Sequence, residues 1–263
     1  MQALLLAFFI FSSPNSKAAA LLTLIIDDIG SQLTNGKQAL LLPGDITYAL
    51  LPYSTHANAL SEIGLNLNKE FILHSPMQSI DSRLINDQTL HIHMTNKQFR
   101  QQLNDQLKLF PFIKGINNHM GSLLTTHPAY MKLVMQELKQ NDLFFIDSRT
   151  TVKTIASKVA IENNIPTIER DVFLDTDQSF QSMNQQFNVA INLAQKNGHA
   201  VIIAHPYNNT LEFLKKRLLK LDHSKIKLVS ASKLIQALLD TRNEKSIDTT
   251  RAGLRRTRSH YNN

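Results

Sequence analysis

The stretch 22–30, LTLIIDDIG (Leu22 to Gly30), decides how the fold of this chain is interpreted. Its first five residues are apolar or β-branched, which is typical of a buried strand, and they run directly into Asp27 and Asp28. Side chains alternate along a strand, so a continuing strand would point the two carboxylates to opposite faces. Gly30 instead predicts a turn that begins at Asp28 and aims both at one side. Two adjacent ionised carboxylates repel each other, and a cation beside them would offset that repulsion. The stretch therefore predicts a cation site at a strand end.

Apolar runs of strand length alternate with helical segments along the rest of the chain. The expected strands are 22–27, 46–51, 70–74, 113–117, 143–147, 167–174, 200–205 and 226–229; the expected helices are 55–67, 96–110, 128–140, 152–164, 180–197, 210–221 and 231–239. Repeated strand–helix units predict a parallel sheet with helices outside it. We expect an α/β fold, a distorted barrel of about seven or eight such units, with a doubly wound open sheet as the alternative. Segment 78–95 has no clear period and predicts a long loop over one rim.

Most of the expected strands end in residues that bind metals or move protons. These residues are Asp27, Asp28, His74, Asn117, Asn118, His119, Asp147 and His205, with Arg170 and Asp171 inside the sixth strand. The carboxyl ends of parallel barrel strands share one face, so convergence there predicts an active site. Each residue alone also has a structural explanation: Asp147 could cap the following helix, and Arg170 could pair with a neighbouring carboxylate.

Three of these residues form a candidate ligand set. Asp28, His74 and His119 would supply one carboxylate and two imidazoles, leaving coordination positions open for water and substrate. Zn²⁺, Fe²⁺, Co²⁺ and Ni²⁺ all suit such a set, and we expect a divalent transition metal, Zn²⁺ first among them. The same cation would stabilise the adjacent carboxylates in their ionised form.

The two ends of the chain differ from its middle. The apolar run from Ala3 to Phe11, the turn-forming residues 12–16 and the alanines 18–20 predict a signal peptide over 1–20, although no Lys or Arg precedes the run. An N-terminal core helix or a misassigned start is the alternative. The run is too short to span a bilayer, so we expect a periplasmic or secreted protein with no transmembrane segment in the mature chain. Residues 241–263 predict a disordered basic tail.

Composition limits the remaining classes of function. The chain has 263 residues, enough for one domain with a substantial core, which we place at 21–240. It has no cysteine, which excludes disulfides, thiolate metal sites and a cysteine nucleophile. No G-x-S-x-G stretch occurs, which disfavours a serine hydrolase. The net charge of +7 comes partly from the tail, and without basic residues interleaved with aromatic ones we expect no nucleic-acid partner.

Six motifs carry a resemblance to a known family. IIDDIG, LHSPM, GINNHMGS, FFIDSRT, RDVFLD and AHPY, in this order, resemble the divergent polysaccharide deacetylase family, a distant branch of the NodB-homology carbohydrate esterases. The resemblance covers about 21–239. It implies a distorted β/α barrel that removes acetyl groups from N-acetylated sugars with the help of a metal, acting on an envelope polysaccharide or peptidoglycan-type glycan.

The resemblance also implies roles for individual residues. By similarity, Asp27 is the general base, Asp28 a metal ligand, His74 the first histidine of the metal motif and His205 the general acid. The candidate substrate-binding residues are Asn118, Asp147, Arg170 and Tyr207.

The chain departs from the family pattern at three points. Gln78 stands where the metal motif carries its second histidine, so His119 is inferred as the substitute from its expected strand end. Ala204-His205-Pro206-Tyr207 replaces Gly-His-Pro-His, and the superfamily's arginine–proline motif is absent, which weakens a base-orienting role for Arg170. A catalytically silent glycan-binding envelope protein on the same fold is therefore the alternative, and a phosphate-ester hydrolase is a third hypothesis that has no motif of its own.

Overall fold

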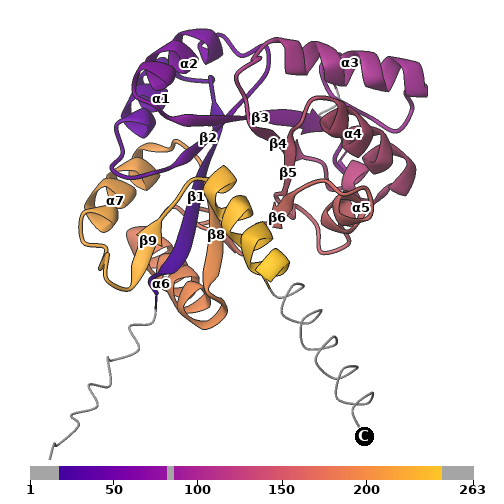
Figure 1. The fold of residues 1–263 in the computed structure, drawn as a ribbon. Helices are drawn as coiled ribbons and strands as arrows, with labels where there is room; N and C mark the ends of the chain where they lie inside the picture. Colours follow the sequence, from indigo (N-terminus) through magenta and orange to yellow (C-terminus); the bar gives the residue numbers. More distant parts are fainter. Residues whose placement is uncertain (1–17, 82–85, 245–263) are drawn as a thin grey trace, which may run out of the picture.

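A computed structural model of the protein describes residues 18–81 and 86–244, which form one α/β unit (Figure 1). One nine-stranded sheet has the order β6-β5-β4-β3-β2-β1-β8-β7, with β9 beside β1, and its strand pairs are parallel. The strands are β1 (Ala20–Ile29), β2 (Thr47–Leu50), β3 (Glu70–Met77), β4 (Gly115–Met120), β5 (Phe144–Asp147), β6 (Thr167–Glu169), β7 (Val172–Phe173), β8 (His199–Ala204) and β9 (Ile226–Leu228).

The sheet closes into a distorted barrel where the expected strand 167–174 divides in two. β6 pairs with β5 at one edge of the sheet, and β7 pairs with β8 at the other. The two residues between them bond to both edges: Arg170 N–H donates to Asp147 O and Asp171 N–H to Val201 O, each at 2.9 Å. The three Cα steps from Glu169 to Val172 span about 11 Å at most, so the two edges must lie close together. The barrel prediction is confirmed, and the open-sheet alternative does not apply.

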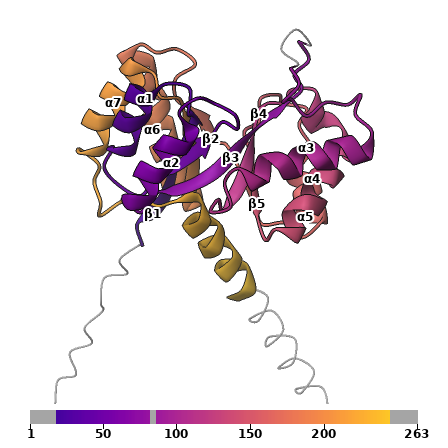
Figure 2. The same ribbon diagram turned by 90° about the horizontal axis from the view of Figure 1, so that it is seen from above.

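Helices cover the outside of this barrel. They are α1 (Leu33–Leu40), α2 (Ala57–Asn66), α3 (Asn96–Lys108), α4 (Pro128–Gln140), α5 (Ala156–Glu162), α6 (Phe180–Asn197) and α7 (Asn208–Leu218), followed by a helix over 231–244. Figure 2 shows α1, α2, α6 and α7 on one side of the molecule and α3, α4 and α5 on the other. Within the described residues, no helix has the length and apolarity that a membrane crossing requires.

Apart from the divided strand 167–174 and shifts of a few residues at element ends, the expected elements match the structure with two differences. Helix α1 was not predicted, because Gly36 lowers helix propensity; a Cβ there would lie 2.3 Å from Leu60 Cδ1, which explains the glycine. The C-terminal helix continues through 241–244, where the sequence predicted the tail to begin. The rest of the expected tail and residues 1–17 of the expected signal peptide lie outside the described residues, and Ala20, its last residue, is the first of β1.

Alternation along β1 separates two apolar cores. Leu24 and Ile26 belong to the larger cluster between the sheet and the helices, whereas Ile25 belongs to a smaller cluster inside the barrel. Leu234 and Ile235 of the C-terminal helix also pack into this inner cluster. The inner core is therefore covered at the amino ends of the strands, and the carboxyl ends remain for the polar residues.

Replacing Gly115, the first residue of β4, should destabilise the inner core. A Cβ at this position would lie 2.3 Å from Phe144 Cδ2 and 2.6 Å from the backbone Phe144 O, so the backbone itself would have to move. We expect Gly115→Ala to lower the free energy of unfolding by about 1–3 kcal/mol in urea denaturation. The control is Asn184→Ala on the exposed face of α6. This substitution should leave the free energy of unfolding unchanged or slightly raised. Equal stability of both variants would contradict the packing argument.

Candidate active site

The paired carboxylates lie in an irregular part of β1. Ile26 pairs with Tyr48 and Ile29 with Leu50, so three steps along β1 match two along β2. This arrangement is a β-bulge, and Asp28 has a left-handed φ of 57° within it. The expected turn at Asp28 is wrong, because β1 continues to Ile29. The bulge nevertheless has the expected consequence, since both carboxylates approach His74 Nε2, Asp27 Oδ2 at 3.7 Å and Asp28 Oδ1 at 3.3 Å.

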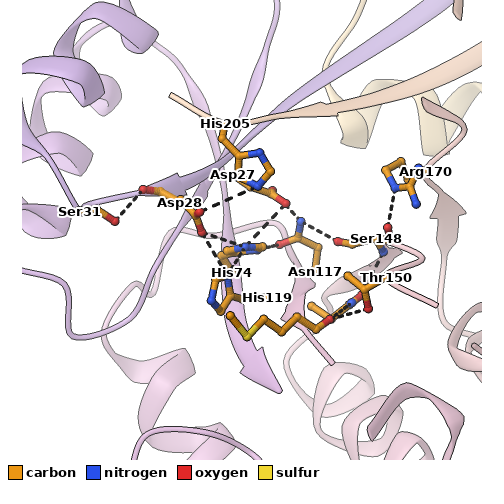
Figure 3. Close-up of polar contacts among 12 residues, drawn as sticks. Asp27, Asp28, Ser31, His74, Asn117, His119, Ser148, Thr150, Arg170 and His205 are labelled. Carbon is orange, nitrogen blue, oxygen red and sulfur yellow. Dashed lines mark hydrogen bonds and ion pairs between the residues drawn. The ribbon is translucent and has the colours of Figure 1, made fainter. Parts of the chain in front are cut away.

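The three candidate metal ligands converge on one another (Figure 3). Asp28 Oδ1 lies 3.3 Å from His74 Nε2 and 3.1 Å from His119 Nδ1, and the two ring nitrogens are 3.0 Å apart. In the part of the chain that the structure describes, these residues form a group of ligand atoms within 4.8 Å of one another. Asp28 Oδ1 is buried without a hydrogen-bond partner there. One carboxylate oxygen and two imidazole nitrogens at one point fit a divalent transition metal.

Asn117 connects this ligand set to the neighbouring carboxylate. Its Nδ2 donates to Asp27 Oδ1 at 2.8 Å and to Ser148 Oγ at 3.2 Å, so its amide oxygen is the atom that faces His74. That oxygen lies 2.7 Å from His74 Nδ1, which must therefore be a protonated ring nitrogen. His74 Nε2 is left to face Asp28 and His119. A partner of this kind on the outer nitrogen fixes the tautomer and ring orientation of metal-binding histidines.

The two aspartates differ in electrostatic environment. Burial raises the pKa of Asp27, although His74, His205 and the Asn117 hydrogen bond partly oppose that effect. Burial also disfavours ionised Asp28, but the hydrogen bonds and positive charges of His119 and His74 outweigh this effect. They hold the pKa of Asp28 well below its usual range. Burial would lower the pKa of His74, yet Asp27 and Asp28 outweigh it and raise that pKa to about 9. A positive charge at His74 Nε2 is therefore stabilised, and a divalent cation would compete with the proton for this position.

His205 faces the carboxylates from across the site (Figure 3). Its Nε2 lies 3.9 Å from Asp28 Oδ2, and its Nδ1 lies 3.1 Å from Asp175 Oδ1. The other oxygen of Asp175 accepts the backbone N–H of His205 at 2.7 Å. The ring also stacks with Phe173 and Tyr207, at centroid distances of 5.2 and 5.4 Å. Burial would lower the pKa of His205, but the Asp175 hydrogen bond and the charge of Asp27 outweigh it and raise that pKa.

Other predicted site residues make structural contacts. Asp147 accepts Arg149 N–H and Thr154 Oγ1–H, each at 2.8 Å, and so holds the β5–α5 connection as the helix-capping alternative suggested. Arg170 donates to the carbonyl oxygens of Ser148 at 2.6 Å and Arg149 at 2.7 Å. None of the hydrogen bonds described for Arg170 reaches Asp27, and the side-chain donor described for Asp27 is Asn117 Nδ2.

Two further side chains hold connections near the site. Asn118 Nδ2 donates to Met120 O at 2.7 Å, while its Oδ1 accepts Ser148 N–H at 3.0 Å. Gln78, which stands at the place of the superfamily's second histidine, accepts Ile92 N–H through Oε1 at 2.9 Å and anchors the loop after β3. Tyr207 stacks on His205 and is 41% exposed, so its substrate-binding role stays a prediction.

Sequence reasoning missed the orienting residues. Asn117 was noted only as part of a strand end, and Asp175 was quoted only as the last letter of RDVFLD. Both residues could have been noticed, since each lies inside a motif that already carried a candidate site residue: His119 beside Asn117, and Arg170 in the motif of Asp175. Their partners could not be read from the sequence, because Asp175 and His205 are 30 residues apart and Asn117 and Asp27 are 90 apart.

Known proteins share much of this sequence. Residues 24–235 match the family described as divergent polysaccharide deacetylase. A protein of Haemophilus influenzae is 34% identical over 232 residues, which cover 88% of this chain and 80% of that protein. The Escherichia coli protein YibQ is 34% identical over 244 residues, which cover 93% of this chain and 73% of that protein. Both relatives are described as uncharacterized proteins.

Solved structures share the fold at low sequence identity. An uncharacterized protein from Agrobacterium tumefaciens has a TM-score of 0.79 at 17% identity, covering 84% of this chain and 91% of that one. A mutant of the peptidoglycan deacetylase PdaC from Bacillus subtilis has a TM-score of 0.54 at 14% identity, covering 91% and 99%. A CE4 family pseudoenzyme from Bacillus anthracis has a TM-score of 0.52 at 16% identity, covering 85% and 66%. With a family match that runs from β1 into the C-terminal helix, this chain belongs to the divergent polysaccharide deacetylase family.

Proposed function

We propose that the protein is a metal-dependent hydrolase that removes N-acetyl groups from an envelope polysaccharide, with a peptidoglycan-type glycan as the expected substrate. The observation that carries the proposal is the convergence of Asp28, His74 and His119, with Asp27 and His205 beside them. Family membership and the likeness of fold to a peptidoglycan deacetylase support the substrate class. The apolar run and small residues at 1–20 support a periplasmic or secreted location.

Asp28, His74 and His119 would hold the metal, and their donor set favours Zn²⁺. A bound divalent metal would supply Lewis-acid polarisation of the acetyl carbonyl and make a water molecule more acidic. Asp27, held by the Asn117 N–H, would accept the proton of the attacking water. His205, oriented by Asp175, would donate a proton to the departing amine nitrogen. Figure 3 shows Asp27 and His205 next to each other, both close to the proposed metal ligands Asp28 and His74.

Acetate release tests this proposal directly. The protein is stripped of metal, reconstituted with Zn²⁺ and incubated with N-acetylglucosamine oligosaccharides, and acetate and free amine are both measured. We expect the two products in equal amounts, and we expect Asp27→Asn to lose most of the turnover while still binding Zn²⁺. Metal binding without acetate release on glycan substrates would contradict the deacetylase assignment.

A catalytically silent glycan-binding protein is the second candidate. Gln78 at the place of the second histidine and the absent arginine–proline motif favour it. The likeness of fold to a CE4 family pseudoenzyme is compatible with it. Binding of the same oligosaccharides without turnover in the presence of bound Zn²⁺ would select this candidate.

A further inference from the structure

The imidazole of His205, the proposed proton donor, is held by more than its hydrogen bond to Asp175. Its ring is nearly parallel to that of Phe173, at an interplanar angle of 24° and a centroid distance of 5.2 Å. The Tyr207 ring stacks on it as well, at 28° and 5.4 Å. A single hydrogen bond fixes one atom of the imidazole and leaves the tilt of its plane open. The stacked rings restrict that tilt, so they help to set the direction in which His205 Nε2 points.

The two stacking partners differ in how firmly the fold holds them. Tyr207 is 41% exposed and follows the end of β8. Phe173 is half-buried, pairs with Ile203 across β7 and β8, and packs against the apolar cluster inside the barrel. Phe173 is therefore the partner whose position the barrel itself determines.

The guanidinium group of Arg170 lies over the Phe173 ring, with Cζ 4.9 Å from the ring centroid. A guanidinium in this position is attracted to the negative face of the aromatic ring. The Arg170 side chain is fixed at the same time, because it donates to the carbonyl oxygens of Ser148 at 2.6 Å and Arg149 at 2.7 Å. These contacts join the β5–α5 connection to Phe173 across the place where β6 and β7 close the barrel.

Ser148 also contacts the side chain that holds the proposed proton acceptor (Figure 3). Its Oγ accepts from Asn117 Nδ2 at 3.2 Å, and the same amide donates to Asp27 Oδ1 at 2.8 Å. The buried Ser148 thus meets the acceptor side of the site through its hydroxyl group and Arg170 through its carbonyl oxygen. From Arg170 the contacts continue to Phe173 and so to the donor side of the site.

We propose that Arg170 is a positioning residue for His205 and acts through Phe173. The guanidinium holds the Phe173 ring, and that ring holds the tilt of the imidazole. This inference rests on the proposed function, because it takes His205 as the proton donor to the departing amine nitrogen. A displacement of about 1 Å in a reacting group can cost about 100-fold in rate, so the tilt of this ring matters for turnover.

A double-mutant cycle in the Zn²⁺-loaded protein tests the proposal. Acetate release from N-acetylglucosamine oligosaccharides is measured for Arg170→Leu, for Phe173→Leu and for the two combined. We expect Arg170→Leu to lower kcat about 10–100-fold, with KM within about twofold and unchanged Zn²⁺ content. The combined variant should lose no more kcat than Phe173→Leu alone, because Arg170 acts through that ring. Losses that multiply in the combined variant would overturn the proposal.

Nuclear Overhauser contacts between the ring protons of His205 and Phe173 add a readout that needs no substrate. We expect these contacts to weaken in Arg170→Leu. Arg170→Lys keeps a cation for the Phe173 ring, so it should retain the contacts and recover most of the kcat. The control is Lys153→Leu, which removes an exposed cation from the same β5–α5 connection and should change neither kcat nor the ring contacts.

Each failure has a separate meaning. Either an unchanged kcat or unchanged ring contacts in Arg170→Leu would overturn the positioning role and leave the proposed function standing. A parent protein that releases no acetate would overturn both. If Arg170→Leu does not fold, Arg170→Gln replaces it, since an amide still reaches a carbonyl oxygen but carries no charge. This variant should also lower kcat and weaken the ring contacts, and retention of either would overturn the proposal.

Discussion

Replacing His74 and His119 together by alanine is expected to abolish stoichiometric Zn²⁺ binding. The parent protein should hold about one Zn²⁺ per chain after chelation, reconstitution and desalting, because three ligand atoms already converge within 4.8 Å. The double variant keeps only Asp28, and one carboxylate does not make a transition-metal site. Elemental analysis measures the metal content. Thermal unfolding gives a second readout, since Zn²⁺ at a hundred times its Kd stabilises the parent by about 2.7 kcal/mol and should leave the variant unaffected.

A matched pair of histidines controls for nonspecific binding. His93→Ala/His223→Ala also removes two imidazoles, both exposed and outside the candidate ligand set, and should retain the full metal content. Retention of Zn²⁺ by a folded His74→Ala/His119→Ala protein would show that the cation binds elsewhere. A parent chain that holds no metal after reconstitution would overturn the metal site and the proposed mechanism together.

Sequence alone predicted the meeting of these ligands for a simple geometric reason. Asp28, His74 and His119 lie near the carboxyl ends of β1, β3 and β4, and parallel strands bring those ends to one face whatever the local detail. The same reasoning did not predict the contacts of Asp147 and Arg170, whose substrate-binding roles stay predictions. Their side chains bond to the β5–α5 connection and to backbone carbonyl oxygens, and side-chain direction in a connection depends on local turns that periodicity does not encode.

The orientation of the carboxylates shows a second limit of sequence reasoning. Strict alternation along a continuing strand would point Asp27 and Asp28 to opposite faces. Because Gly30 follows them, the sequence instead predicted a turn that begins at Asp28. The structure uses a bulge, which inserts one residue into β1 without ending it. Whether a strand bulges depends on the register of its neighbour β2, and that register is a tertiary property. The convergence of the candidate ligands was therefore predictable, and the backbone that brings them together was not.

Replacing Asn117 by leucine is expected to impair metal binding and turnover together. Leucine has the same number of side-chain heavy atoms and the same branching as asparagine but offers neither the N–H that reaches Asp27 nor the oxygen that faces His74 Nδ1. Loss of an orienting partner typically lowers metal affinity about 10–100-fold. Turnover at saturating Zn²⁺ should fall further, because Asp27 loses its 2.8 Å hydrogen bond as well. Competition with a chelator gives the affinity, and acetate release gives the turnover.

Ser148→Ala separates positioning by Asn117 from simple packing. It removes the weaker 3.2 Å contact to Asn117 Nδ2 and leaves the bonds to Asp27 and His74 in place. We expect unchanged Zn²⁺ content and turnover within about fivefold, which is the effect of one ordinary hydrogen bond. The ¹⁵N chemical shifts of His74 add a readout that packing does not control, since they report which ring nitrogen carries the proton. Unaltered shifts and affinity in Asn117→Leu would show that another group sets the tautomer of His74. Altered shifts in Asn117→Leu alone would establish one buried amide as the link between proton acceptor and metal ligand.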